Sequence, residues 1–291
     1  MNEHGRRGTR LKELYGSALK KLKRAGVESP ELEARIFIKK ALGATDAYIY
    51  AHPESSVNSG ALAAFDSLIE RRLAGEPVAY ILEEKEFYSR SFSVNRHVLI
   101  PRPETELVVR EALGIIRALH EGAGVVDVGT GCGCIAVTVA LEAPGTKVVA
   151  TDSSQDALEV AASNARRLCA EGRVEFLQGD LLSPLGDGTM DVVVSNSPYV
   201  SEVEYGDLSR EVRDFEPPGA LIGGKDGLDV IRRIVRDAPR ALKSPGSCVI
   251  EIGESHSTAV KEIFAETGFI DIAVVKDYAG LDRVVRGQWR R

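Results

Sequence analysis

The residues with the clearest capacity for chemistry lie in three short segments, each placed after an apolar run. The first is a glycine loop that follows Asp127 and consists of Gly129, Thr130, Gly131, Cys132 and Gly133. Glycines allow the backbone to turn tightly and to approach a ligand closely. The second is Asp152, because an acidic residue at the end of the next strand commonly bonds ribose hydroxyls. The third is Gly179-Asp180, which is placed to meet an adenine edge. Three such segments in order predict a site for an adenosine-containing cofactor, rather than glycines that serve only a tight turn.

The spacing of the glycines distinguishes between two adenosine cofactors. The dinucleotide fingerprint is G-x-G-x-x-G, whereas this loop reads G-x-G-x-G and continues with Cys134, Ile135 and Ala136. A ligand without a pyrophosphate therefore fits better than NAD. We expect S-adenosylmethionine as the cofactor, with S-adenosylhomocysteine as the product, and we expect no metal. An NAD(P)-dependent oxidoreductase is the alternative from another enzyme class.

A fourth segment, which consists of Asn196, Ser197, Pro198 and Tyr199, resembles the (N/D)PPY/F motif of methyltransferases that modify planar NH2 groups. The nitrogen of such a group is a poor nucleophile, because its lone pair is delocalised. Asn196 Oδ1 and the backbone carbonyl of Ser197 can accept both N–H bonds and stabilise the charge that grows on nitrogen. Tyr199 would pack against the planar group. Alone, these four residues are typical of a β-turn, but their place after a fourth strand favours the catalytic interpretation.

The elements that must position these segments form an alternating pattern. Short apolar runs at 124–129, 147–152, 173–178, 191–196 and 248–253 predict strands, and helical stretches lie between them. This alternation indicates a parallel sheet covered on both faces. The runs 269–275 and 283–289 are too close for a helix between them, which predicts an antiparallel hairpin. The expected fold class is therefore α/β, a doubly wound and mostly parallel seven-stranded sheet with a terminal hairpin.

The first 77 residues have a different pattern, with apolar residues at helical spacing in four short segments. They predict a small helical bundle. Residues 78–100 are rich in β-branched and aromatic residues, which predicts a hairpin. We expect a helical substrate-docking domain over 1–77, a β-hairpin bridge over 78–103 and a catalytic domain over 104–291.

Composition and charge limit the possible partners. The 291 residues are 44% hydrophobic and 27% charged, with a formal net charge of −6, which argues against binding nucleic acid mainly through phosphates. Residues 1–96 have 16 lysines and arginines against 13 acidic residues, so the excess acidity lies in the remainder. The basic excess, which includes Arg6 and Arg7, indicates a solvated face or a docking surface for an acidic partner. The four cysteines and the lack of a membrane span or signal sequence predict a cytoplasmic protein.

At this point the sequence resembles the release-factor glutamine N5-methyltransferases, the PrmC/HemK family, over nearly its whole length. The matching stretches are EFYSRSFSV, VLIPRPETELVV, DVGTGCG, VVATD, NSPYV, VRDFEPPGALIGGKDGLD, EIGESH and KDYAGLDRVVRGQ. The resemblance implies a class I methyltransferase domain joined by a hairpin to an N-terminal helical domain. It implies methyl transfer from S-adenosylmethionine to the amide N5 of the glutamine in the GGQ motif of class I peptide-chain release factors.

The resemblance also implies roles for individual residues. Cofactor binding falls to the glycine loop and to Asp127, Asp152, Asp180, Leu181 and Asn196. Asn196, Ser197, Pro198 and Tyr199 would hold the glutamine amide. Arg102 and Glu104, in the PRPETE segment, would help to line the substrate path, unless they form only a surface ion pair. The expected partner is a class I release factor, with no direct contact to nucleic acid or membrane, and the protein is expected to be a monomer.

One departure from the family pattern falls in the catalytic motif. The family usually has a proline where this chain has Ser197, so the carbonyl remains but a new N–H needs a partner.

Two further interpretations stay open. The first is an amino-methyltransferase that acts on adenine or guanine in nucleic acid, because it shares the motif chemistry. The second is a catalytically silent adaptor, which only the Ser197 substitution supports.

Overall fold

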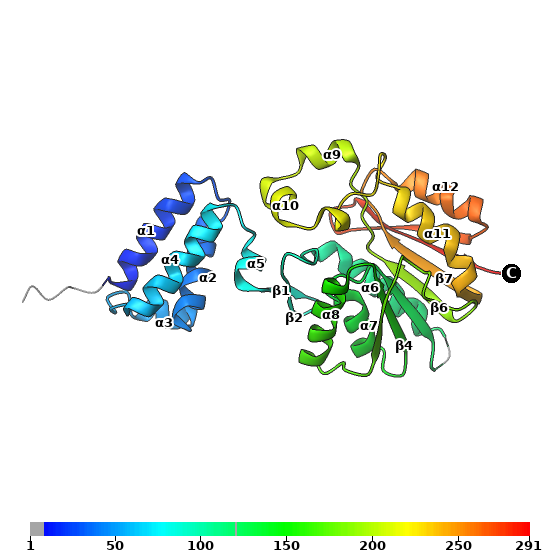
Figure 1. The fold of residues 1–291 in the computed structure, drawn as a ribbon, viewed down its shortest axis with the longest axis horizontal. Coiled ribbons are helices and arrows are strands. Elements are labelled where there is room, and N and C mark those ends of the chain that lie inside the picture. Colours follow the sequence, from blue (N-terminus) through cyan, green and yellow to red (C-terminus); the bar gives the residue numbers. More distant parts are fainter. Residues whose placement is uncertain (1–8, 120) are drawn as a thin grey trace, which may run out of the picture. The chain divides into compact units, whose positions relative to one another are not determined.

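The computed structural model describes residues 9–119 and 121–291, so Arg6 and Arg7 lie outside the described residues. The chain divides into two units, Met1–Leu82 and Glu83–Arg291 (Figure 1). No helix in the described part of the chain is long and apolar enough to cross a membrane.

The first unit is a helical bundle, as the spacing of its apolar residues predicts. Its helices are α1 (Leu11–Arg24), α2 (Pro30–Leu42), α3 (Asp46–Ala51), α4 (Ser59–Leu73) and α5 (Val78–Leu82). Leu22 from α1, Phe37 and Ile38 from α2, and Phe65 from α4 are almost fully buried in a common core. Gly43 ends α2 in a left-handed conformation with a φ of 62°, which a residue with a Cβ adopts less readily.

The prediction that VAYIL, residues 78–82, belongs to a hairpin was wrong. This segment is the short helix α5, in which the carbonyl of Pro77 accepts hydrogen bonds from the N–H groups of Tyr80 and Ile81. Ile81 is 2% exposed and belongs to the core of the first unit. The β-branched and aromatic composition is therefore overridden by the preceding proline and by burial against the bundle.

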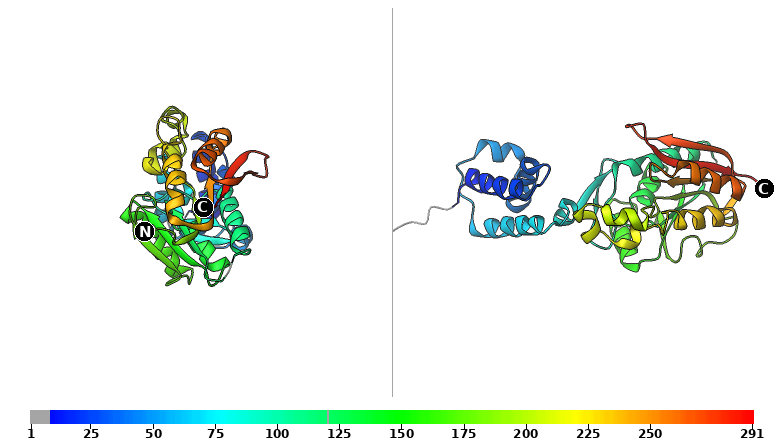
Figure 2. Two further views of the ribbon diagram at one scale, coloured as in Figure 1. Left: turned by 90° about the vertical axis from the view of Figure 1, so that its right-hand side faces the viewer. Right: turned by 90° about the horizontal axis from the view of Figure 1, so that it is seen from above.

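The second unit contains the predicted seven-stranded sheet. Its strands are β3 (Gly124–Val128), β4 (Lys147–Asp152), β5 (Val174–Gln178), β6 (Met190–Ser195), β7 (Leu242–Glu251), β8 (Ile270–Lys276) and β9 (Asp282–Trp289). They lie in the order β5-β4-β3-β6-β7-β9-β8. The first five are parallel, and β9 is antiparallel to both β7 and β8. The fold prediction, including the terminal hairpin at one edge of the sheet, is confirmed (Figure 2).

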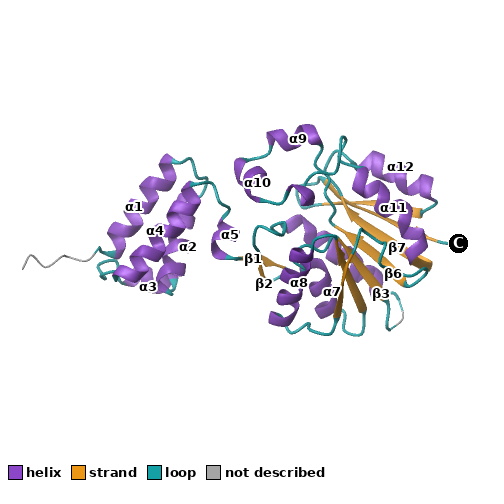
Figure 3. Cartoon of the chain, in the orientation of Figure 1, coloured by secondary structure: helices purple, strands orange, loops and turns teal. Residues whose placement is uncertain are grey.

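Helices cover both faces of this sheet (Figure 3). One face carries α6 (Glu106–Ile116), α7 (Cys134–Glu142) and α8 (Gln155–Arg167), and the other carries α11 (Asp229–Ala241) and α12 (Ser257–Thr267). Every residue of β3 and of β6 is buried, which explains why these strands read as continuous apolar runs.

The hairpin predicted within residues 78–100 is present but shorter. It consists of β1 (Glu84–Phe87) and β2 (Arg90–Ser93), which pair in antiparallel fashion. It packs against α8 through Asn164, whose buried amide bonds both the N–H and the carbonyl of Ser93. The same amide donates to the carbonyl of Cys132. Asn164 therefore ties the hairpin to the glycine loop. Residues 98–100, which were expected to be strand, are not.

Two short helices follow the NSPY motif and lead into the FEPP segment, residues 215–218. They are α9 (Glu202–Asp207) and α10 (Arg210–Phe215), and neither was predicted. Neither has a buried residue, so the sequence carries no apolar stripe that would reveal them. Short 3-10 turns at Pro103–Thr105 and Pro218–Ala220 complete this side of the unit.

Candidate active site

The predicted site residues come together because the parallel strands end at one edge of the sheet. Gly129 follows β3, Asp152 ends β4 and Asn196 follows β6. A cavity of about 350 Å³ opens there, within the range usual for small-molecule sites. Of the predicted residues, ten line it: Gly129, Thr130, Gly131, Cys132, Asp152, Asp180, Leu181, Asn196, Ser197 and Pro198. The structure places five others, Asp127, Gly133, Tyr199, Arg102 and Glu104, outside its lining.

The glycines of the loop serve two different purposes. Gly129 and Gly131 have φ angles of 71° and 55°, and a Cβ on either would meet no atom within 4 Å. They give the loop its left-handed turns and leave open space for a ligand. A Cβ on Gly133 would lie 3.0 Å from the Cβ of Ala161, so this glycine permits close packing of α7 against α8.

Asp127 supports the loop from behind. Its Oδ2 accepts a hydrogen bond of 2.7 Å from the Thr130 hydroxyl and one of 3.1 Å from the N–H of Ala136. The side chain is 1% exposed, and burial raises the pKa of Asp127 to about 7 against the opposing effect of these two bonds. Asp127 therefore fixes the shape of the loop and of the first turn of α7.

The two other acidic residues lie at the cavity itself. Asp152 accepts hydrogen bonds of 2.9 Å from the N–H of Gly131 and from the N–H of Ser154, so its carboxylate is oriented by backbone on both sides. Asp180 pairs with Arg233 of α11 at 2.5 Å. Arg233 also lines the cavity, and the sequence analysis did not predict it.

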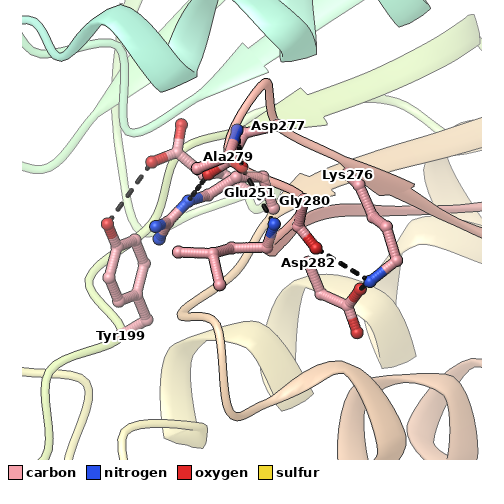
Figure 4. A network of polar contacts seen from close by, with 9 residues as sticks. Tyr199, Glu251, Lys276, Asp277, Ala279, Gly280 and Asp282 are labelled. Carbon is pink, nitrogen blue, oxygen red and sulfur yellow. Dashed lines mark hydrogen bonds and ion pairs between the residues drawn. The ribbon is translucent and has the colours of Figure 1, made fainter.

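The NSPY motif is held by residues from distant parts of the chain. Asn196 Nδ2 donates a hydrogen bond of 3.0 Å to Thr105 Oγ1, so Asn196 Oδ1 points the other way. The Tyr199 hydroxyl donates to Glu251 Oε1 at 3.4 Å (Figure 4). Burial raises the pKa of Tyr199 well above its usual range. The Ser197 hydroxyl is buried and has no hydrogen-bond partner among the described residues.

A glycine-rich segment, residues 221–227, packs against the backbone of the NSPY motif and supports it. The backbone of Val200 exchanges hydrogen bonds of 2.9 Å with Leu221 and Gly223. A Cβ on Gly223 would lie 2.6 Å from the carbonyl oxygen of Pro198, and one on Gly227 would lie 2.3 Å from that of Tyr199. Only glycine permits this approach of one backbone to another.

Arg102 has a partner different from the one the sequence suggested. It pairs with Glu216 at 2.5 Å, and among the described residues it makes no ion pair with Glu104. The Glu216 side chain is 1% exposed and also accepts a hydrogen bond of 3.1 Å from the N–H of Ile100. The PRPETE and FEPP segments are therefore locked together. The idea of an Arg102–Glu104 surface pair was wrong.

Besides Arg233, five residues that shape the site received no role from the sequence: Thr105, Glu216, Gly223, Gly227 and Glu251. Thr105 and Glu216 stand inside segments that were quoted, and their buried side chains contact residues about a hundred positions away in the chain. Glu251 opens the EIGESH stretch quoted above, and a second signal was that a buried carboxylate at the end of an apolar strand is unusual.

The fold and the site together define a class I S-adenosylmethionine-dependent methyltransferase. The strand order, the glycine loop after β3 and the carboxylate that ends β4 fit an adenosine with an amino-acid tail.

Comparison with known proteins identifies the family. The PrmC N-terminal domain family matches residues 13–82, and the methyltransferase small domain family matches residues 113–211. A release factor glutamine methyltransferase from Koribacter versatilis is 43% identical over 279 residues, which are 96% of this chain and 98% of the relative. One from Geobacter sulfurreducens is 42% identical over 90% of this chain and 91% of its own length. The chain belongs to the release factor glutamine methyltransferase family.

Solved structures agree on the fold. A methyltransferase from Pyrococcus furiosus has a TM-score of 0.51 at 18% identity, over 76% of this chain and 98% of its own.

The brace behind NSPY can be tested with Gly227→Ala. The new Cβ would overlap the Tyr199 carbonyl, and the φ of 77° disfavours alanine. We expect the displaced motif to cost about 10²-fold in kcat for methyl transfer, since small misplacements of reacting groups have effects of that size. Gly206→Ala is the matched control, because Gly206 has open space and an ordinary φ. Equal activity in the two variants would show that the brace is unimportant.

The buried Asp127 carboxyl should make stability depend on pH. The pKa of Asp127 is about 7 in the folded protein against an ordinary aspartate value of 3.8, so the folded state holds this proton more tightly. The stabilisation is therefore complete below about pH 4 and is lost as pH rises through about 7. Relative to Asp127→Asn, the wild type should become less stable from about pH 5 to about pH 8, as measured by urea denaturation. A constant difference between the two proteins would contradict this.

The Ser197 hydroxyl, which has no hydrogen-bond partner in the described part of the chain, should lower the stability of the fold. We expect Ser197→Ala to raise the free energy of unfolding by about 1 kcal/mol, because a buried donor without a partner is removed. Ser195→Ala is the matched comparison, since the buried Ser195 hydroxyl donates to the carbonyl of Val128 at 2.7 Å. That variant should lose about 1 kcal/mol. Chemical denaturation of both would test the contrast, and the same sign of change in both would refute it.

Proposed function

We propose that this protein transfers a methyl group from S-adenosylmethionine to the side-chain amide N5 of the glutamine in the GGQ motif of class I peptide-chain release factors. The observation that carries the proposal is the arrangement of Asn196 and Ser197 at the cofactor cavity. The Asn196 amide is fixed through Nδ2, which leaves Oδ1 available to accept, and Ser197 contributes a second acceptor through its carbonyl. A planar NH2 group needs two acceptors of this kind.

The chemistry follows from the weakness of an amide nitrogen as a nucleophile. Two acceptors aimed at its N–H bonds hold the nitrogen in line and stabilise the positive charge that grows there. When bound, S-adenosylmethionine supplies the methyl group from a sulfonium, which leaves as the neutral thioether of S-adenosylhomocysteine. Orientation of the amide by Asn196 and Ser197 then replaces the need for a strong base. The methylated nitrogen, which carries the positive charge, loses one of its two protons to water and becomes the neutral N-methyl amide.

We assign the remaining site residues by their surroundings. Asp152, oriented by two backbone N–H groups, would bond the ribose hydroxyls, and Asp180 and Leu181 would meet the adenine. The glycine loop would hold the amino-acid end, with Asp127 as its support. Arg102 would act on the substrate path through its pair with Glu216, which fixes the PRPETE segment.

The partner and the domain roles are proposals of the same kind. The first 77 residues would dock the release factor, and α1 carries an exposed basic row, Lys20, Lys21, Lys23 and Arg24, that suits an acidic surface. Residues 78–103 would be the bridge, and 104–291 the catalytic domain. We propose a cytoplasmic monomer that does not contact nucleic acid or membrane directly.

The test is transfer of a labelled methyl group to a release factor with an intact GGQ loop. We expect label on the glutamine and none on a loop in which that glutamine is replaced. Asn196→Ala should lower kcat by about 10²- to 10³-fold, because it removes one of two acceptors in the transition state. Binding of S-adenosylhomocysteine, measured by calorimetry, should be spared. Label on RNA or DNA instead of the release factor would favour an adenine or guanine amino-methyltransferase, and no transfer by the folded protein would refute the proposal.

A further inference from the structure

The orientation of the Asn196 amide poses a physical problem. An asparagine side chain has nearly the same shape after a half-turn, which exchanges its oxygen and its NH2 group. Only one of the two orientations presents an acceptor to a substrate N–H. The proposed reaction therefore depends on whatever group fixes Asn196, and that group must accept a hydrogen bond from Nδ2.

Thr105 is the group in contact with Nδ2. Its Oγ1 accepts from Asn196 Nδ2 at 3.0 Å, and the residue is 1% exposed at the end of the 3-10 turn Pro103–Thr105. A hydroxyl can also donate to Asn196 Oδ1, and in that case it would stabilise the wrong orientation. Thr105 is selective only if its single proton is committed to another acceptor.

The carboxyl group next to Thr105 is that of Glu251. Hydrogen bonding by Thr105 lowers the pKa of Glu251. In the parallel register of β6 and β7, Ser195 lies opposite Ile250, which places Asn196 beside Glu251. The carboxyl is 1% exposed, and its Oε1 accepts from the Tyr199 hydroxyl (Figure 4). Its Oε2 is buried and has no hydrogen-bond partner among the described residues, so this oxygen is open to a donor.

Glu251 would influence the reaction through other residues rather than by contact with the substrate. Thr105 lines the cavity but Glu251 does not, so the carboxylate has no contact with a bound substrate there. The charged and titratable groups that act on it are Arg283, Tyr199, Glu104 and Cys134. Arg283 belongs to β9 and is itself held at 3.1 Å by Asp277, which lies in the turn between β8 and β9.

We propose that Glu251 and Thr105 are positioning residues for methyl transfer. The Glu251 carboxylate takes the Thr105 proton, which commits Thr105 Oγ1 to accept from Asn196 Nδ2, and this keeps Asn196 Oδ1 directed at the substrate amide. Tyr199 donates to the same carboxylate and so couples the two ends of the NSPY motif. The inference rests on the proposed function and adds the groups that enforce its geometry.

The arrangement predicts a dependence on the protonation of Glu251. Burial raises the pKa of Glu251 to about 7. A protonated Glu251 can donate to Thr105 Oγ1, which frees the Thr105 proton to bond Asn196 Oδ1 and favours the half-turned amide. The carboxylate is therefore the active form, and kcat should rise with pH through about 7.

The experiment compares Thr105→Val, Thr105→Ser and Glu251→Gln. Thr105→Val keeps the shape but removes the hydroxyl, and we expect kcat to fall about 10- to 100-fold with S-adenosylhomocysteine affinity unchanged. Thr105→Ser should recover activity to within about 3-fold of the wild type, because the hydroxyl returns. Thr138→Val is the matched control, since Thr138 is a buried threonine of α7 whose hydroxyl has no partner among the described residues. Its kcat should equal that of the wild type.

In Glu251→Gln the rise of kcat near pH 7 should disappear. Wild-type kcat in Thr105→Val, equal loss in the serine and valine variants, or an unchanged pH profile in Glu251→Gln would each overturn the proposal.

A second measurement does not require substrate. The side-chain NH2 resonance of Asn196, assigned by its loss in Asn196→Ala, should be protected from hydrogen exchange in the wild type and in Thr105→Ser. The protection should be lost in Thr105→Val, and the resonance should titrate near pH 7 in the wild type but not in Glu251→Gln. This pattern in a protein that transfers no label would refute the proposed substrate and leave the positioning intact. An unprotected NH2 group in the wild type would overturn the positioning itself.

Discussion

Parallel strands must all end at the same edge of their sheet, and the whole site depends on this constraint. β4, β3, β6 and β7 end in register, so Asp152, the glycine loop, Asn196 and Glu251 are brought to one edge although they are far apart in the chain. The helices on both faces supply the burial that holds the strands in that register.

A parallel sheet places the ends of its strands at one edge, but it does not fix the orientation of the side chains there. Two other devices do that here. Glycines at 223 and 227 let a second backbone segment press against the carbonyls of Pro198 and Tyr199. Half-buried hydrogen bonds fix Asn196 and Asp152. These supports matter more in this chain because Ser197 stands where the (N/D)PPY motif has the first of its two prolines. The rigidity that a ring would provide comes instead from contacts outside the motif.

The parts of the structure that the sequence predicts are those written in local patterns. Strand runs of buried residues, the glycine loop and the NSPY turn can each be identified within about a dozen positions, and the sheet and its terminal hairpin followed from them. The contacts between Asn196 and Thr105, and between Arg102 and Glu216, join residues 91 and 114 positions apart. No local pattern encodes such a pairing. The error at 78–82 has a related cause, because the burial of Ile81 against the bundle decides the conformation there.

Two buried carboxylates illustrate why some functional residues escape a search for cavity-lining groups. Asp127 and Glu251 are each 1% exposed, and burial raises the pKa of both to about 7. Burying a carboxyl group costs free energy unless hydrogen bonds compensate it. A buried carboxyl group at either position is therefore expected to have a role in the structure or in function. Asp127 fixes the shape of the glycine loop at the cavity, and Glu251, as proposed above, fixes the direction of the Asn196 amide. The residues that line the cavity can then be small and few, because Asp127 and Glu251, which do not line it, orient them.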